Sequence, residues 1–392
     1  MFPKKILTRR QALYLGLGTL AGLSTCTKSQ WSNEENSTFQ TFDESAEIDP
    51  IAIGETSLKE RAAAKGLIYG AAARNVELKN NQFSASVIQE CGMMVPKWEF
   101  RWNWLNPSPD NFNFSQTDLM VKWAMTQGML LRGHTLIYHQ SMPKWFRERV
   151  NRQNVEQIFL QYIQKVVGHY AGQIHSWDVA NETIFPPDED PNNLRKTKWA
   201  KWLGLDYFDL VFHAAAAADP QALLVLNEDW INPDTDEGEA KRVAVLKLLE
   251  KLKSQEIPID ALGMQSHIWA KDQAPLNQKK IRTFVSEVAQ LGLKIIITEL
   301  DVNDRHLPKD ILVRDRLVAQ AYSDYLSAVL DEPAVIAVNT WGLSDRYTWL
   351  AHPKRGARDD GASTRPLPLD EQFNRKLAWY AMANAFDNAP NR

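Results

Sequence analysis

Eight short apolar segments alternate with segments of helical periodicity along most of this chain, and this alternation limits the possible fold more than any other feature. In the helical segment before the fourth apolar one, Val155, Phe159 and Tyr162 fall on a single face. Alternating strands and helices build parallel sheets, whose near-continuous apolar strands are buried on both faces. We therefore predict an α/β protein, a single (β/α)8 TIM barrel. The eight predicted strands are residues 66–73, 91–96, 129–136, 173–180, 222–227, 259–265, 293–299 and 334–340.

The sequence before this pattern has a different character. Lys4, Lys5, Arg9 and Arg10 precede an apolar run, residues 12–23, that is too short to span a bilayer. The arginine pair resembles a twin-arginine export signal. We expect residues 1–26 to be that signal, residues 27–57 to be a disordered polar tether, and residues 58–392 to form the catalytic barrel. The protein is then exported to the periplasm or the extracellular space, with Cys26 as a candidate lipid anchor.

Composition excludes several classes of protein. The net charge of the 392 residues is -3, which gives no basic surface for nucleic acid. The two cysteines, Cys26 and Cys91, cannot supply a disulfide framework, and Cys91 is expected to be a small buried hydrophobe. No Gly-x-Gly-x-x-Gly sequence follows the first predicted strand, which argues against a dinucleotide cofactor. We expect a monomer that needs no protein partner and no cofactor.

Polar side chains gather where the predicted strands end. The reacting groups of such barrels lie at the carboxyl ends of the strands, so these residues should meet at one mouth. The segments concerned are Arg132-Gly133-His134, Asn181-Glu182, Gln265-Ser266-His267, Thr298-Glu299-Leu300-Asp301 and Trp341. Two glutamates without a metal-binding motif suggest glycoside cleavage, in which one carboxylic acid protonates the leaving oxygen and a carboxylate attacks the anomeric carbon. A separation of about 5 to 5.5 Å between the carboxyl groups selects the retaining route.

These motifs, together with Trp177-Asp178-Val179-Ala180 before Asn181 and Gly342-Leu343-Ser344-Asp345 after Trp341, resemble glycoside hydrolase family 10, the barrel-type endo-1,4-β-xylanases. The resemblance covers residues 58–385. It implies retaining hydrolysis of internal β-1,4 bonds in xylan-type polysaccharide, with a β-linked polysaccharide or oligosaccharide as the only partner and no metal. By the same resemblance, Glu182 is the acid/base and Glu299 the nucleophile. The implied substrate-binding residues are His134, Asn181, Gln265, His267, Trp341, Trp349, Arg101 and Tyr138, and Asp301 orients His267.

The chain departs from the family pattern on one side of the site. Where the family has a Glu-Asn pair and a following Lys, this chain has Lys97, Trp98 and Arg101. Tyr138 replaces a Trp, and Ser141 replaces a Gln. An unpaired sugar hydroxyl weakens binding by about 0.5 to 1.5 kcal/mol. We therefore predict an altered glycone subsite.

Three alternatives remain at this point. The same mechanism could act on a different β-glycan or a short oligosaccharide. The chain could instead be a non-catalytic carbohydrate-binding derivative, although such a protein would not need a proton donor. A metal-dependent barrel hydrolase is the third alternative, and motifs favour it least, because His134 and His139 lie five residues apart without a His-x-His pair on the first strand.

Overall fold

The computed structural model describes residues 54–270 and 276–392. The predicted export signal, with Cys26, and all but the last four residues of the predicted tether lie outside the described residues. The first described helix, α2 (Leu58–Ala63), is capped by Ser57, whose side chain accepts from Glu60 N while the Glu60 carboxylate accepts from Ser57 N. No helix in the described part of the chain is long and apolar enough to cross a membrane.

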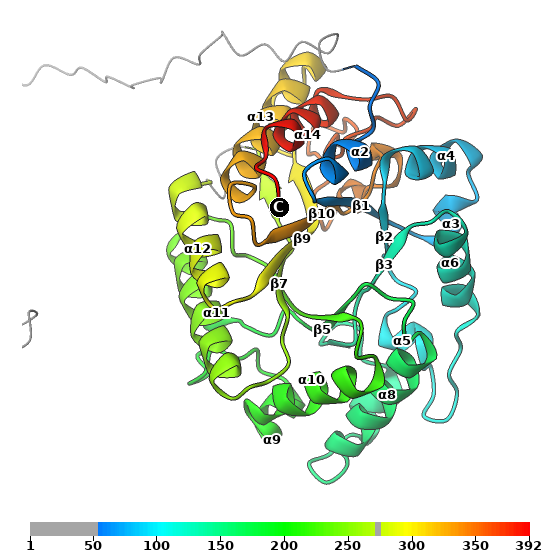
Figure 1. The fold of residues 1–392 in the computed structure, drawn as a ribbon, viewed down its shortest axis with the longest axis vertical. Helices are drawn as coiled ribbons and strands as arrows, with labels where there is room; N and C mark the ends of the chain where they lie inside the picture. The colour runs from blue at the N-terminus through cyan, green and yellow to red at the C-terminus, as the bar shows by residue number, and fades with distance from the viewer. Residues whose placement is uncertain (1–53, 271–275) are drawn as a thin grey trace, which may run out of the picture. The chain divides into compact units, whose positions relative to one another are not determined.

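Eight parallel strands close into a barrel, which confirms the predicted fold. Closure occurs because β10 pairs with both β1 and β9, so the sheet has no free edge along these strands. Figure 1 shows the labelled strands surrounded by the labelled helices. The strands are β1 (Ile68–Ala73), β2 (Met93–Pro96), β3 (Leu130–Gly133), β5 (Ser176–Asn181), β6 (Leu223–Glu228), β7 (Ala261–Met264), β9 (Lys294–Asn303) and β10 (Val335–Thr340).

Two predicted strands run past the carboxyl end of the observed strand. The third strand ends at Gly133, and the chain pairs with β5 again only at β4 (Ile137–Tyr138). The sixth strand ends at Met264, and β8 (His267–Trp269) resumes pairing with β9. Ser266, between them, has a φ of 65°, in the left-handed region that interrupts a strand. Both interruptions lie where the sequence changes from apolar to polar, at the mouth of the barrel.

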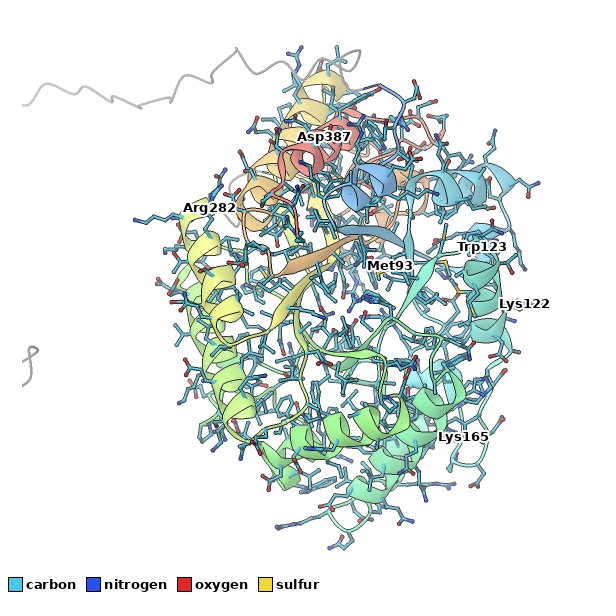
Figure 2. All side chains as sticks on the ribbon, viewed as in Figure 1. Met93, Lys122, Trp123, Lys165, Arg282 and Asp387 are labelled. Atoms are coloured by element: carbon cyan, nitrogen blue, oxygen red, sulfur yellow. The ribbon has the colours of Figure 1, made fainter. Side chains whose placement is uncertain are left out.

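The helices form the outer layer, and charged side chains such as Lys122, Lys165 and Arg282 extend from its outer side (Figure 2). One helix begins at Ser115, and Phe114, whose side chain makes no capping hydrogen bond, occupies the cap position. The side chain of Asn113 instead accepts the hydrogen bond from Ser115 N. The remaining helices are α3 (Asn75–Leu78), α4 (Asn81–Glu90), α5 (Trp102–Leu105), α6 (Ser115–Thr126), α7 (Lys144–Arg149), α8 (Val155–His169), α9 (Lys198–Leu203), α10 (Asp206–Ala218), α11 (Asp236–Ser254), α12 (Gln278–Gln290), α13 (Ile311–Val329) and α14 (Leu377–Asn388).

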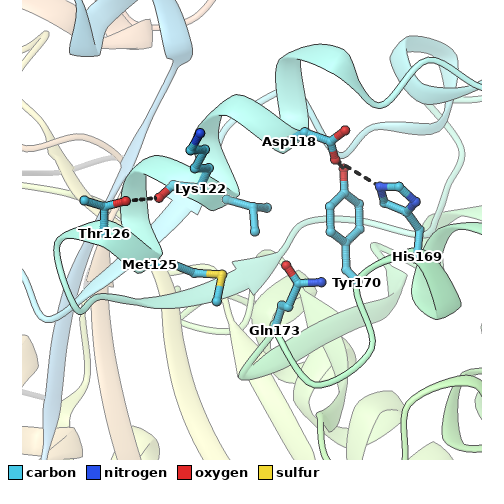
Figure 3. Close-up of a pocket in the computed structure, with 8 residues that line it drawn as sticks. Asp118, Lys122, Met125, Thr126, His169, Tyr170 and Gln173 are labelled. Atoms are coloured by element: carbon cyan, nitrogen blue, oxygen red, sulfur yellow. Dashed lines mark hydrogen bonds and ion pairs between the residues drawn. The ribbon is translucent and has the colours of Figure 1, made fainter.

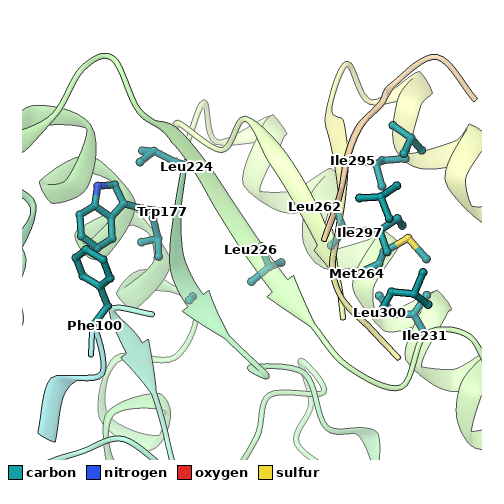
Figure 4. Packing of buried hydrophobic residues seen from close by; sticks show 14 of the residues in the cluster. Phe100, Trp177, Leu224, Leu226, Ile231, Leu262, Met264, Ile295, Ile297 and Leu300 are labelled. Atoms are coloured by element: carbon teal, nitrogen blue, oxygen red, sulfur yellow. The ribbon is translucent and has the colours of Figure 1, made fainter. Parts of the chain in front are cut away.

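The main hydrophobic core lies between the strands and the helices. Figure 4 shows its strand side, where Trp177 of β5 meets Phe100 edge to face with ring centroids 5.1 Å apart. Cys91 is 1% exposed in this core, as predicted. A separate small cluster of Val225, Ala261, Ile296 and Ala337 comes from alternate positions of neighbouring strands. Because strand side chains alternate, this cluster occupies the barrel interior beneath the polar mouth.

Candidate active site

An irregularity in β5 decides which of its side chains face the barrel interior. Asp178 and Asn181 lie three residues apart, but their partners on β6, Val225 and Asn227, lie two residues apart. The extra residue is a β-bulge, which shifts the alternation of the strand by one position. Asp178 and Asn181 therefore both face inward, and Glu182 follows directly at the rim.

A second irregularity lies at the corresponding level of β9. Ile297 and Leu300 lie three residues apart and pair with residues of β10 that lie two apart. The two residues between them are Thr298 and Glu299, and both side chains reach Asn227: Thr298 Oγ1 donates to Asn227 Oδ1 at 2.7 Å, and Asn227 Nδ2 donates to Glu299 Oε1 at 2.9 Å. A regular strand would send adjacent side chains to opposite faces. The bulge therefore turns Glu299 into the mouth.

Glu299 is 5% exposed and is surrounded by groups that favour its charge. Besides the bond from Asn227, His267 Nε2 lies 3.3 Å from Oε2 and His134 Nδ1 lies 3.9 Å from Oε1. Burial alone would raise the pKa of Glu299, but the imidazole of His134 and the hydrogen bonds from His267 and Asn227 outweigh it and lower the pKa to about 2. Glu299 is a carboxylate at neutral pH.

Glu182 has a different environment. Its main chain adopts a left-handed conformation with φ 52°, and its carbonyl oxygen accepts from Arg195 Nε at 2.8 Å. Its Oε1 accepts from Tyr138 Oη at 3.0 Å and from Gln265 Nε2 at 3.3 Å. The nearest cation to Oε2 is the Arg195 guanidinium at 3.9 Å, beyond hydrogen-bonding distance. Oε1 is therefore occupied by donors, and Oε2 is the oxygen left to carry a proton.

The electrostatic setting of Glu182 is opposite to that of Glu299. Burial is the largest cause, and with the negative charges of Asp229 and Glu299 it raises the pKa of Glu182 to about 7, despite the hydrogen bonds from its two donors. One carboxyl group of the pair thus holds its proton to near neutral pH while the other stays ionised. Such separation of pKa values distinguishes an acid from a nucleophile.

His267 lies between Glu299 and Asp301. Its Nδ1 lies 2.9 Å from Asp301 Oδ1, and Asp301 Oδ2 accepts from Trp349 Nε1 at 2.6 Å. Burial disfavours the imidazolium, but Asp301 and Glu299 outweigh this and raise the pKa of His267. Trp341, 6% exposed, stands edge-on to His134 with ring centroids 5.2 Å apart. The two predicted indoles therefore stand beside the imidazoles that surround Glu299.

Three amide side chains form a network between the two glutamates. Asn181 Oδ1 accepts from Asn227 Nδ2 at 2.8 Å and from Gln265 Nε2 at 3.4 Å. The Nδ2 donor of Asn181 makes no hydrogen bond with any residue that the structure describes. Sequence reasoning did not include Asn227, although it ends the fifth predicted strand and so carried the same positional signal as Asn181.

A buried charged pair, Arg132 and Asp178, supports this network. Neither residue was assigned a role from the sequence. Asp178 Oδ2 lies 2.9 Å from His134 Nδ1, and Asp178 Oδ1 pairs with Arg132. Arg132 Nε also donates to Ser176 Oγ at 3.1 Å. Arg132, Asp178 and Ser176 are fully buried, so they fix the position of His134.

The main chain after Glu182 is held by a second group that was not predicted. Glu228 Oε1 accepts from Thr183 N at 2.7 Å and from Ile184 N at 3.2 Å. Lys241 Nζ lies 2.6 Å from Glu228 Oε2 and donates to Ile184 O at 2.6 Å. These buried contacts support the left-handed turn that aims Glu182.

The residues that depart from the family pattern lie directly after β2 and in or after β4. Lys97 is 4% exposed, and burial lowers its pKa. The Arg101 guanidinium lies 5.9 Å from the centre of the Tyr138 ring. Ser141 is turned away from the mouth, since its Oγ donates to Tyr138 O at 3.2 Å. Of these residues, Tyr138 alone contacts a candidate catalytic carboxylate.

A groove of about 570 Å³ lies between α6 and the end of α8, and no residue at the carboxyl end of a strand lines it (Figure 3). Its Asp118 already accepts from Tyr170 Oη at 2.9 Å and lies 3.0 Å from His169 Nε2. It contains no second carboxylate, so the mouth remains the candidate site. Within residues 54–270 and 276–392, no group of three or more His, Cys, Asp or Glu side chains is placed to hold a metal ion. His139 instead stands edge-on to Tyr138, with ring centroids 4.9 Å apart.

The sequence profile of glycosyl hydrolase family 10 matches residues 57–385, nearly the whole barrel. The chain belongs to this family. Among the family's characterised members, it is 32% identical over 339 residues to endo-1,4-β-xylanase A of Phanerodontia chrysosporium, which covers 84% of this chain and 77% of that protein. It is 30% identical over 340 residues to endo-1,4-β-xylanase 1 of Humicola insolens, covering 85% and 75% respectively.

The family's solved structures have the same barrel. Xylanase 10B of Thermotoga petrophila, crystallised in complex with xylobiose, superimposes with a TM-score of 0.77 at 28% identity. That match covers 85% of this chain and 98% of the xylanase. A family 10 barrel therefore extends over nearly all the residues that the structure describes.

Proposed function

We propose that this chain is a retaining endo-1,4-β-xylanase in which Glu182 is the acid/base and Glu299 the nucleophile. The observation that carries the proposal is the opposite electrostatic setting of two glutamates at one mouth: the pKa of Glu182 is raised to about 7, and that of Glu299 is lowered to about 2. Double displacement at an acetal needs this combination of one proton donor and one ionised nucleophile. The names of the family 10 relatives support xylan as the substrate.

In the first step, an ionised Glu299 oxygen attacks the anomeric carbon while Glu182 Oε2 gives its proton to the departing glycosidic oxygen. The bond from Asn227 and the nearby His267 hold the Glu299 carboxylate in place. Asn181 Nδ2 then donates to a sugar hydroxyl next to the reacting carbon. Such a bond strengthens as positive charge develops on the sugar.

In the second step, Glu182 is a carboxylate and takes a proton from a water molecule. The oxygen of that water attacks the anomeric carbon, and the bond from this carbon to Glu299 breaks. Glu299 leaves as a carboxylate, and the product keeps its anomeric configuration. Once the bond to Glu299 has formed, the negative charge of Glu299 is gone. The pKa of Glu182 then falls, because that charge is one of the causes that raise it. The same residue can therefore act first as acid and then as base.

Trapping with a 2-deoxy-2-fluoro xyloside that carries an activated leaving group tests this assignment. Peptide mapping should find the covalent label on Glu299. Glu182→Ala should lose activity on xylan but keep slow turnover of an activated aryl xyloside, and azide should accelerate that turnover. The control is Glu250→Gln, on the exposed side of α11, which should label and turn over normally. Inversion of the product's configuration, read by NMR, would overturn the covalent route.

The identity of the glycan has its own test. Lys97, Trp98 and Tyr138 stand where the family pattern has Glu, Asn and Trp, which supports an altered glycone subsite or a different β-glycan. Rates on xylan, mixed-linkage glucan and nitrophenyl glycosides separate these substrates. The highest kcat/KM on a glucan would replace xylan with glucan while leaving the two-glutamate mechanism intact.

We also propose that the enzyme is exported and acts as a monomer. The support for export is the twin-arginine-like sequence with Arg9 and Arg10, and Cys26 stays a candidate lipid anchor. Cell fractionation of the full chain beside an Arg9→Lys/Arg10→Lys variant tests export, and a Cys26→Ala variant tests the anchor. Retention of the unmodified chain and of the Arg9→Lys/Arg10→Lys variant in the cytoplasm would refute export. Light scattering of the purified protein gives the oligomeric state.

A further inference from the structure

Two arginines beside the mouth have no acidic partner. The Arg74 guanidinium stacks on Trp98 with its central carbon 3.7 Å from the ring centre, and that of Arg101 lies over Tyr138. Neither forms an ion pair with any residue that the structure describes, and the Nε atom of each is buried without a hydrogen-bond partner. A buried guanidinium donor without an acceptor is costly, so an acceptor from a ligand would stabilise it.

The carboxylates nearest in sequence to Arg74 and Arg101 bind other groups. Glu77 Oε2 accepts from Arg74 N at 3.0 Å and lies 3.5 Å from Lys97 Nζ. Glu99 accepts from Asn75 N at 2.9 Å and from Trp98 N at 3.2 Å. Both carboxylates therefore hold main-chain amides, and neither neutralises a guanidinium group.

An aromatic surface adjoins these cations. Trp98 is 38% exposed and Trp104 is 48% exposed, and their ring centroids lie 6.2 Å apart. Large exposed indoles in such a pair offer apolar faces for the C–H side of a sugar ring. A stacked guanidinium beside them is held in orientation and can still donate in its own plane. Aromatic and cationic recognition thus lie together on one surface, made of Arg74, Trp98, Arg101 and Trp104.

This surface is continuous with the candidate active site. Arg101 lies over Tyr138, and Tyr138 donates to Glu182 Oε1. Lys97 lies between the surface and the opposite wall: its Nζ donates to Tyr347 O at 3.2 Å and lies close to Gly342, next to Trp341. A glycan held by Glu182 and Glu299 can therefore extend over the two arginines.

We propose that the surface of Arg74, Trp98, Arg101 and Trp104 binds a carboxylated sugar, a uronate unit of the glycan being cleaved. This inference rests on the proposed glycan hydrolysis and specifies its substrate class. The arginine fork matches a carboxylate with paired donors, which a neutral xylose cannot do. The indoles bind the sugar ring that bears the carboxylate. The uronate is either a branch on a xylan backbone or a unit of the backbone itself.

The test compares glucuronoxylan with the same polymer after its carboxyl groups are reduced to alcohols, and with β-1,4-glucuronan. The full chain should cleave glucuronoxylan with kcat/KM about tenfold above the reduced polymer, as one charge-assisted bond implies. Adding 0.5 M NaCl should shrink this ratio, because exposed ion pairs are screened. Preference for glucuronan over glucuronoxylan assigns the uronate to the backbone, and the reverse assigns it to a branch.

Variants locate the effect. Arg74→Met should lower the ratio while activity on the reduced polymer persists. Arg101→Met should bring the ratio close to one. Arg101→Lys keeps the charge but loses the paired donors, so part of the preference should return. Lys122→Met, on the exposed face of α6, is the charge-matched control and should keep the full ratio.

Binding to the inactive Glu299→Gln variant gives a second readout that does not need turnover. Calorimetry should show about tenfold tighter binding of glucuronoxylan fragments than of reduced fragments. Equal kcat/KM on the acidic and reduced polymers by the unmodified protein overturns the inference while leaving the proposed hydrolysis intact. A tenfold ratio that survives both arginine variants also overturns it. If no polymer is cleaved, the proposed function fails, and equal binding of the two fragments would then refute the surface as well.

Discussion

Replacing Glu182 by Gln should stabilise the folded protein at alkaline pH and leave its stability almost unchanged at acid pH. The pKa of Glu182 in the folded chain is about 7, raised from an ordinary value of 4.5 by burial and by the charges of Asp229 and Glu299. Its side chain is only 14% exposed, so solvent screens the effect little. The Gln side chain keeps an oxygen for the bonds from Tyr138 and Gln265.

The sign and size follow from linkage between ionisation and folding. Below pH 4.5 the Glu182 carboxyl is protonated in both states, so it has no pH-dependent effect. Between pH 4.5 and 7 the unfolded chain ionises first, and the folded enzyme therefore loses stability as the pH rises. Each unit of pKa difference is worth about 1.4 kcal/mol. Above pH 8 the ionised Glu182 should cost about 3 kcal/mol, which Glu182→Gln recovers.

Urea unfolding followed by tryptophan fluorescence at pH 4 and pH 8.5 measures the difference. The variant should unfold with the unmodified protein at pH 4 and at higher urea at pH 8.5. Glu250→Gln, which removes an exposed carboxylate from α11, is the control and should not gain stability between the two pH values. An equal advantage of Glu182→Gln at both pH values, or none at pH 8.5, would refute the electrostatic argument for Glu182 as the proton donor.

Three further predictions follow from the same contacts. The profile of kcat/KM against pH should be bell-shaped. It should fall above about pH 7 as Glu182 loses its proton, and at strongly acid pH as Glu299 gains one. An unchanged alkaline limb in Glu182→Ala, measured with an activated aryl substrate, would contradict this assignment. Tyr138→Phe removes a donor to ionised Glu182, so the alkaline limb should move to higher pH; a shift to lower pH would be the wrong sign. Gly133→Ala would place a methyl group 2.1 Å from the Trp177 ring and should lower the stability of the fold by about 1 to 3 kcal/mol or more. Gly168→Ala, in α8 with open space around it, should raise the stability by up to about 1 kcal/mol. Thermal unfolding of both variants checks this contrast.

The sequence by itself determined the architecture and the end of the barrel at which the candidate site residues lie. Apolar runs of strand length alternate with segments of helical periodicity, and a closed parallel barrel buries both faces of every such strand. The carboxyl ends of those strands must then meet at one mouth, so polar residues that end a strand, such as Glu182, Gln265 and Glu299, could be assigned to one site. This inference needs only parallel strands, which the helices between successive strands imply.

Only the tertiary structure decided how those residues are aimed and charged. Strict alternation would send Thr298 and Glu299 to opposite faces, and the bulge in β9 that brings both to Asn227 depends on pairing with a strand about 40 residues away. The pKa values of Glu182 and Glu299 diverge because burial and neighbouring charges differ between two places a few ångströms apart. Local sequence cannot predict these distances, because they depend on contacts between strands that are far apart in the chain. For the same reason, the unpaired state of Arg74 and Arg101 became visible only once the folded chain showed which carboxylates lie elsewhere.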